Sequence, residues 1–137
     1  MEKKFVVIIT AIVLNEDNKF LLVKRKENQE IHPGKWLLPG GKLEEDESLF
    51  QALKREIKEE TNLEIEDYNK YINDYIFERP NKDLTLGMTF LVKATNDNVS
   101  LNKREYDDFI WITKEELQNY DYLKFIKKEV EKAFKNK

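Results

Sequence analysis

The sequence predicts a layered α/β domain, and three observations support that prediction. The chain has 137 residues, which is about one domain at ~100–200 residues per domain. Strand-like runs rich in Val and Ile are mixed with amphipathic helical segments along the chain. Hydrophobic residues make up 40% of the sequence, enough for one packed core. Without an internal repeat or a low-complexity linker, we expect a single domain over residues 1–137.

The first elements are expected to be strands. Phe5–Leu14 is rich in Val and Ile and ends in a polar turn, after which Phe20–Lys24 is a second strand-like run. Together they predict a hairpin. Glu27–Lys35 is polar and contains Pro-Gly, which is typical of a loop. Trp36–Leu38 is short and apolar, and the Pro-Gly-Gly sequence at 39–41 interrupts it.

The clearest helix is predicted over Glu47–Thr61. Asp46 is the expected N-cap, with acidic residues in the first turn, where the helix dipole favours them. Asn62 is expected to stop the helix in the left-handed conformation.

The second half predicts more strands and a final helix. Strands are expected at Tyr68–Phe77, Leu84–Ala94 and Phe109–Ile112, and residues 113–116 have capping-box spacing for a short helix. A terminal amphipathic helix is expected over Tyr122–Phe134, and its predicted buried side consists of Leu123, Ile126, Val130, Ala133 and Phe134.

Composition excludes several kinds of site and partner. No cysteine is present, which rules out disulfides, thiolate metal sites, iron–sulfur clusters and thiol nucleophiles. The one histidine, His32, rules out a histidine-rich metal site, and a Ser-His-Asp triad would have to use it. The net charge of -3 argues against long nucleic acid as the main partner, because such binders usually carry a basic excess.

No membrane association is expected either. No apolar run approaches the ~20 residues of a membrane span. The N-terminal stretch superficially resembles a signal peptide, but it includes Thr10 and lacks a small-residue cleavage site. We therefore expect a cytoplasmic protein.

Acidic residues lie on the apolar side of the predicted helix over 47–61. With Glu56 at zero on a helical wheel, Leu53 falls near 60° and Ile57 near 100°. Glu60 falls near 40° and Glu59 near -60° by the same period. Burial of unpaired carboxylates costs several kcal/mol each, so a cation or an open cleft must face them.

A divalent cation suits these acids better than a side chain does. Arg55 is one counter-charge, but it cannot neutralise three carboxylates. Oxygen ligation without His or Cys favours a hard ion such as Mg²⁺ or Mn²⁺. The alternative is that the acids form only surface salt bridges, as Glu-rich helices commonly do.

A spaced pattern surrounds the acids. It consists of Gly41, five residues, Glu47, seven residues, and then the run Arg55-Glu56-Ile57-Lys58-Glu59-Glu60-Thr61-Asn62-Leu63. This pattern strongly resembles the signature box of the Nudix hydrolases. The one departure is Asn62, where the family usually has glycine, and Asn tolerates the left-handed conformation. The resemblance extends from the first strand to Leu117.

The resemblance implies a fold, an activity and a set of ligands. The fold is the Nudix fold, an α/β/α sandwich around a mixed β-sheet, and the activity is water attack on a phosphorus atom of a nucleoside diphosphate linked to another group. The implied ligands of Mg²⁺, with Mn²⁺ as an alternative, are Glu56, Glu59, Glu60 and the backbone carbonyl of Gly40. Glu105 is the candidate for an additional acidic ligand. The alternative, which has equal weight, is that Glu105 is an ordinary exposed residue of a loop.

Further roles follow from the same resemblance. Glu56 is expected to act as the base or to orient the water, although some relatives take the base from elsewhere. Arg55 is expected to fix Glu56 by a charge-assisted hydrogen bond, and Glu47 to support Arg55 or the loop. The candidate substrate-binding residues are Arg25, Lys26, Gly41 and Trp36. Four aromatic residues could stack on a base or belong to the core: Trp36, Tyr75, Phe77 and Trp111.

The leading expectation for the substrate is a canonical or oxidised nucleoside triphosphate, cleaved to monophosphate and pyrophosphate. The alternatives are an RNA 5′ end or a dinucleoside polyphosphate, and a non-catalytic nucleotide-binding module. The oligomeric state stays open, with a homodimer as one alternative because relatives are often dimers.

Overall fold

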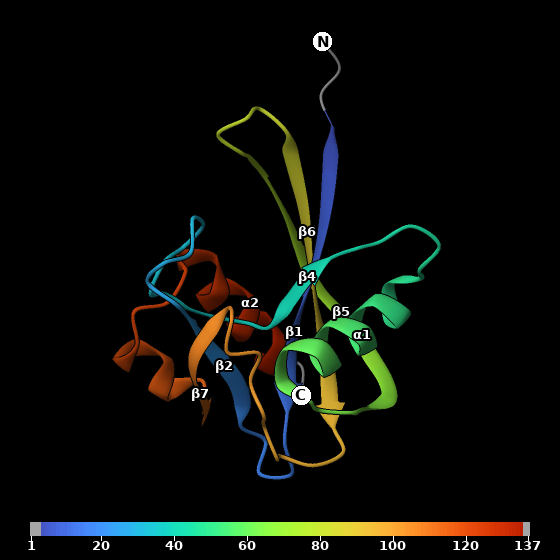
Figure 1. Ribbon diagram of the computed structural model, residues 1–137. Helices are drawn as coiled ribbons and strands as arrows, with labels where there is room; N and C mark the ends of the chain where they lie inside the picture. Colours follow the sequence, from blue (N-terminus) through green and yellow to red (C-terminus); the bar gives the residue numbers. More distant parts are fainter. Residues whose placement is uncertain (1–3, 136–137) are drawn as a thin grey trace.

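The computed structural model describes residues 4–135 and has a mixed seven-stranded sheet between two α-helices (Figure 1). This is the α/β/α arrangement that the sequence predicts. The elements in chain order are β1 (Phe5–Leu14), β2 (Phe20–Arg25), β3 (Trp36–Leu37), β4 (Gly40–Lys42), α1 (Leu49–Thr61), β5 (Ile65–Glu78), β6 (Leu84–Ala94), β7 (Tyr106–Ile112), a 3₁₀ helix η1 (Glu115–Asn119) and α2 (Lys124–Lys135).

Strand β1 is central to the sheet. It runs parallel to β6 along its whole length, from Phe5 opposite Leu84 to Leu14 opposite Lys93. On its other side it pairs antiparallel with β4. The predicted hairpin with β2 forms at its turn, where Leu14 pairs with Phe20. Beyond that point β2 pairs with β7 and β3 instead, because strand partners are chosen by long-range packing.

Alternation along β1 divides the hydrophobic core into two layers, because successive side chains of a strand point to opposite faces. Ile9, Ala11 and Val13 pack against the apolar residues of α1. Ile12 and Leu14 pack on the other face, against the apolar residues of α2. The two helices therefore cover opposite faces of one sheet, and both faces are buried.

Helix α1 begins two residues later than the sequence predicts. Its N-cap is Ser48, whose hydroxyl accepts from the backbone N–H of Gln51, while the Gln51 side chain accepts from the N–H of Ser48. Asp46 has a left-handed backbone with φ of 65° and lies before the cap. The prediction of Asp46 as cap is wrong, and the first turn carries no acidic residue. Asn62 ends the helix in the left-handed conformation with φ of 64°, as predicted.

The C-terminal part follows the prediction closely. Thr113 and Glu116 make the reciprocal capping contacts, and the short helix that follows is a 3₁₀ helix. Helix α2 begins at Lys124, two residues later than predicted. Ile126, Val130 and Ala133 are buried as predicted, whereas Leu123 and Phe134 are only partly buried. The charged residue Glu129 is buried beside them. Within residues 4–135, no helix has the length and apolar character that crossing a membrane requires.

Candidate active site

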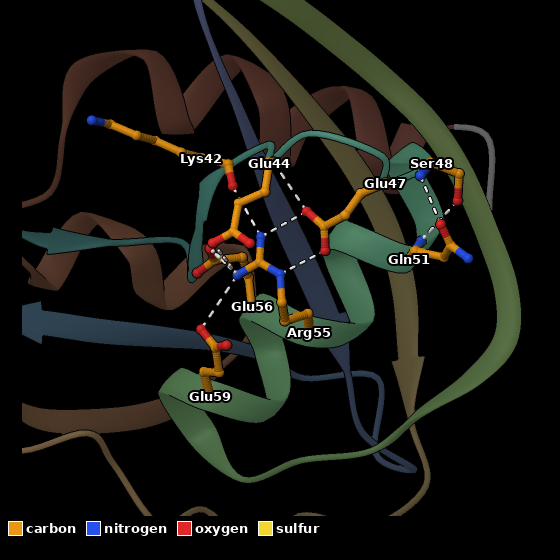
Figure 2. A network of polar contacts seen from close by, with 8 residues as sticks. All are labelled: Lys42, Glu44, Glu47, Ser48, Gln51, Arg55, Glu56 and Glu59. Carbon is orange, nitrogen blue, oxygen red and sulfur yellow. Dashed lines mark hydrogen bonds and ion pairs between the residues drawn. The ribbon is translucent and has the colours of Figure 1, made fainter.

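Arg55 of α1 gathers the acidic residues that the sequence singles out (Figure 2). Its Nε and Nη2 atoms donate to the two carboxylate oxygens of Glu47 at 2.6 and 2.9 Å. Its Nη1 atom donates to Glu56 at 2.8 Å and more weakly to Glu59 at 3.3 Å. Its Nη2 atom also reaches the backbone carbonyl of Lys42 at 3.1 Å. One guanidinium thus fixes the loop before α1, strand β4 and the helix in one arrangement.

These contacts shift the ionisation of both partners. The hydrogen bond from Arg55 lowers the pKa of Glu47. The hydrogen bond to Glu47 contributes most to raising the pKa of Arg55 above its already high value. Because a bidentate pair of this kind fixes distance and plane together, Arg55 and Glu47 act as a rigid support. The expected supporting role of Glu47 is consistent with this geometry.

Glu56 lies between α1 and the two glycines of β4. A Cβ atom on Gly41 would overlap the Glu56 carboxylate, so the side chain rests directly on the glycine backbone. Partial burial raises the pKa of Glu56, and the negative charges of Glu59 and Glu105 add to that rise against the lowering effect of Arg55. The carboxylate therefore lies in a site that favours an additional positive charge.

Glu60 is the buried acid of the site, with 5% of its surface exposed. Its Oε1 atom accepts from the backbone N–H of Gly40 at 2.9 Å, and its Oε2 atom accepts from the hydroxyl of Tyr106 at 3.0 Å. Burial raises the pKa of Glu60 to about 8, and the charges of Glu56 and Glu105 contribute to the rise. Burial also raises the pKa of Tyr106, followed by the charge of Glu60.

Glu59 and Glu105 lie less tightly against the other acids. The Glu59 side chain is 57% exposed, in agreement with its place near -60° on the helical wheel, away from Leu53 and Ile57. The mutual repulsion of Glu105 with Glu56 and Glu60 indicates that the loop before β7 brings it to the same site. As the side chains stand, no three acidic or histidine residues in the described part of the chain form a closed ligand cluster. Exposed Glu59 would have to turn inward to complete one.

A cavity of about 200 Å³ opens beside Gly40 and Gly41. Its lining includes Arg25, His32 and two of the four predicted aromatic residues, Tyr75 and Phe77. The Tyr75 ring is stacked on Phe125 of α2 with centroids 4.5 Å apart. A Cβ on Gly87 of β6 would overlap Tyr75, so this glycine makes room for the ring.

Other predicted substrate-binding residues lie outside the cavity lining. Trp36 packs edge-on against Tyr120 at 5.2 Å between ring centroids. Lys26 contributes its backbone N–H, which donates to the carbonyl of Glu105 at 3.0 Å. That bond ties the end of β2 to the loop that carries Glu105. Trp111 packs against the core on the α1 face of the sheet.

The sequence argument missed several residues of the site. Tyr106 lies in β7, next to Glu105 in the sequence, but only long-range pairing reveals that its hydroxyl reaches α1. Thr10 lines the cavity from β1 and Arg79 from the position just after β5, and neither has a local sequence signal. Phe125 could have been found, because it precedes Ile126 on the helix already predicted to pack against the sheet.

Fold and site together define a Nudix protein. The sequence matches the NUDIX domain family over residues 4–134, and the chain belongs to the Nudix hydrolases, a family of pyrophosphohydrolases. Individual relatives are consistent with this family assignment. The chain is 30% identical to the nucleoside triphosphatase NudI of Salmonella typhimurium LT2 over 122 residues, which cover 82% of this chain and 86% of that protein.

Two more relatives extend the comparison. The NudI protein of Klebsiella pneumoniae strain 342 is 31% identical over 125 residues, covering 83% of this chain and 86% of that protein. Among solved structures, a MutT protein from Methanosarcina mazei Go1 matches with a TM-score of 0.81 and 29% identity, over 100% of this chain and 99% of its own.

Proposed function

We propose that this protein hydrolyses a nucleoside triphosphate to the monophosphate and pyrophosphate with the help of Mg²⁺. One observation carries the proposal. The buried Glu60 and the half-buried Glu56 lie against the glycines of β4, at the side of a cavity with aromatic walls. The description of the NudI relatives as nucleoside triphosphatases supports this choice of substrate.

The donor set fits a hard divalent cation. Desolvation raises the pKa of both Glu56 and Glu60, and each carboxylate repels the other. A cation bound between them would relieve both costs, and all-oxygen ligation is what Mg²⁺ prefers. Glu56, Glu59, Glu60, the carbonyl of Gly40 and Glu105 are the proposed ligands. When bound, Mg²⁺ neutralises phosphate charge and lowers the pKa of a coordinated water.

The residues of this chain then position the reaction. Glu56 is the proposed acceptor for the proton of the attacking water. Arg55 keeps the Glu56 carboxylate in place through its 2.8 Å contact, because its Nε and Nη2 atoms are fixed on Glu47 and on the carbonyl of Lys42. Phosphoryl transfer depends mainly on such positioning and charge stabilisation, so a rigid guanidinium next to the base favours the reaction.

The cavity is the proposed site of the nucleoside. Tyr75 and Phe77 line it, and stacking on an aromatic ring accepts any base. Arg25 lines the same cavity, and its guanidinium is suited to a phosphate oxygen near the mouth. Lys26, Gly41 and Trp36 stay as proposed contributors to substrate binding. Gly41 contributes because a residue without a side chain lets the backbone come close to the substrate. Trp36 contributes by stabilising β3.

The test is a hydrolysis assay with Mg²⁺ on a panel of nucleoside triphosphates, sugar nucleotides and dinucleoside polyphosphates, in which chromatography follows the nucleotide products and a coupled assay follows pyrophosphate. We expect release from nucleoside triphosphates, and a loss of roughly 10²- to 10⁴-fold in Glu56→Gln, the scale of general-base catalysis. Glu45→Gln is the matched control, since Glu45 is exposed in the loop before α1. Equal activity of Glu56→Gln and wild type would remove Glu56 from the mechanism. Absence of turnover on the whole panel would favour a nucleotide-binding module.

A further inference from the structure

A row of polar side chains crosses the sheet beneath α2. Thr10 of β1, Thr89 of β6 and Asn73 of β5 are opposite one another in register. The hydroxyl oxygens of Thr10 and Thr89 are 3.0 Å apart. The cavity is lined by Thr10 and, in the next row of the sheet, by Ile8 and Tyr75. Thr10 therefore belongs both to the polar row and to the cavity lining.

A buried carboxylate covers this row. Glu129 of α2 is 1% exposed, and within residues 4–135 neither of its oxygens has a partner of strict hydrogen-bond geometry. Burial raises its pKa, whereas hydrogen bonding by Thr89 and Asn73 lowers it, so these two side chains supply weak donors. The amide oxygen of Asn73 is occupied by Lys132 at 3.0 Å, which leaves the amide nitrogen to face Glu129.

The direction of each hydrogen bond in the row follows from counting protons. A threonine hydroxyl has one proton and two lone pairs. If Thr89 donates its proton to Glu129, the oxygen of Thr89 must accept the proton of Thr10. Thr10 then has only lone pairs left for the cavity. Because an unpaired buried carboxylate is costly, donation from Thr89 to Glu129 is the favoured direction.

We propose that Glu129, acting through Thr89, orients the hydroxyl of Thr10 as a hydrogen-bond acceptor in the cavity, which thereby selects a base with an amino group on its inserted edge. This inference rests on the proposed function, since it takes the base to enter this cavity. The exocyclic group projects furthest from a base, so it is the group that reaches Thr10. Arg25 and Arg79, which also line the cavity, can only donate, so they cannot replace this acceptor.

The experiment compares matched amino and keto substrates. We expect kcat/KM with Mg²⁺ to be higher for CTP than for UTP, and for ATP than for ITP, by roughly tenfold, the scale of one hydrogen bond. Thr10→Val removes the hydroxyl at constant shape and should bring both ratios close to one. Thr10→Ser keeps the hydroxyl and should keep the preference. Glu129→Gln introduces an amide donor that can reverse the row, so the preference should shrink or invert.

The control is Glu131→Gln, which makes the same change of charge at an exposed position of α2 and should leave the ratios unchanged. Equal kcat/KM within both pairs, with hydrolysis intact, would overturn the inference and leave the proposed function standing. A wild-type preference in Thr10→Val would also overturn the inference and leave the proposed function standing. A wild-type preference in Glu129→Gln would overturn the role of Glu129. If no triphosphate is hydrolysed, calorimetric binding of CMP and UMP decides, and equal affinity would overturn the inference.

Discussion

The hydroxyl of Tyr106 donates a 3.0 Å hydrogen bond to the buried carboxylate of Glu60. This bond joins β7 to the acidic side of α1 across the core. It also occupies the Glu60 oxygen that Gly40 does not contact. Tyr106 therefore orients a proposed metal ligand without being one, in the way that outer residues commonly fix the ligands of a metal site.

Tyr106→Phe is expected to weaken the site and the fold together. Loss of the hydroxyl leaves a buried oxygen of Glu60 without its donor, which costs about 1–3 kcal/mol. Urea unfolding without divalent ions measures this loss, and Mn²⁺ titration followed by electron paramagnetic resonance measures the affinity for metal. Tyr68→Phe, at an exposed ring, is the control. Unchanged stability together with unchanged Mn²⁺ affinity would contradict the role of Tyr106.

The stability of the metal-free protein should fall as the pH rises. Burial raises the pKa of Glu60 from 4.5 to about 8, so the folded state binds this proton more tightly than the unfolded state does. The resulting stabilisation is complete below about pH 4.5 and is lost as the pH rises through about 8. Thermal unfolding in EDTA at pH 5.5, 7 and 8.5 measures it.

The stabilisation of the protein by Mg²⁺ should depend on pH in the opposite direction, because Mg²⁺ competes with the proton for Glu60. Its stabilising effect is expected to grow between pH 5.5 and 8.5 in the same melts. Glu60→Gln should flatten both profiles. A metal-free wild type whose stability rises over this range would show that the titration of Glu60 does not control it.

Gly41→Ala should impair activity more than stability. The backbone of Gly41 lies outside the left-handed region, so alanine fits its conformation. The new methyl group would, however, overlap the carboxylate of Glu56 and displace it. We expect a loss of about a hundredfold in kcat, as for a displacement of ~1 Å at a reacting group, with a nearly unchanged melting temperature.

Gly40→Ala is the contrasting variant. There the added Cβ would meet the backbone of Ile9 and Thr10, which cannot move aside, so stability should fall along with activity. If Gly41→Ala retained full activity, the close contact between β4 and Glu56 would have no catalytic importance.

Ser48→Ala should destabilise the protein by about 1 kcal/mol, the usual cost of losing an N-cap. Asp46→Asn should have little effect, because Asp46 lies outside the helix in a left-handed conformation that asparagine tolerates. Denaturant unfolding of the two variants distinguishes the caps. A larger loss for Asp46→Asn than for Ser48→Ala would contradict the capping by Ser48.

Features set by local periodicity could be predicted from the sequence. The side of α1 that carries Glu60 follows from 3.6 residues per turn, and the left-handed stop at Asn62 follows from the preferences of one residue. The choice between Asp46 and Ser48 as cap could not be predicted, because both are short polar residues. The loop path that decides between them is set by the contact between Arg55 and Glu47.

Long-range contacts could not be predicted from the sequence, for a different reason. Whether β2 pairs mainly with β1 or with β7 depends on partners about 90 residues apart, which hydrophobic patterning does not encode. The contact of Tyr106 with Glu60 has the same origin. Glu129 is the exception, since it lies about 60° from Ile126 on the helical wheel, and the same reasoning that found Glu60 could have found it.

The parallel pairing of β1 with β6 also bears on how the protein is made. Thr10 and Thr89, which face each other in this ladder, are separated by 79 residues of sequence. During synthesis one edge of the first strand must therefore wait, with its amide groups still in water, until most of the chain has left the ribosome. Such distant pairings slow folding, so the complete sheet is a late product of translation.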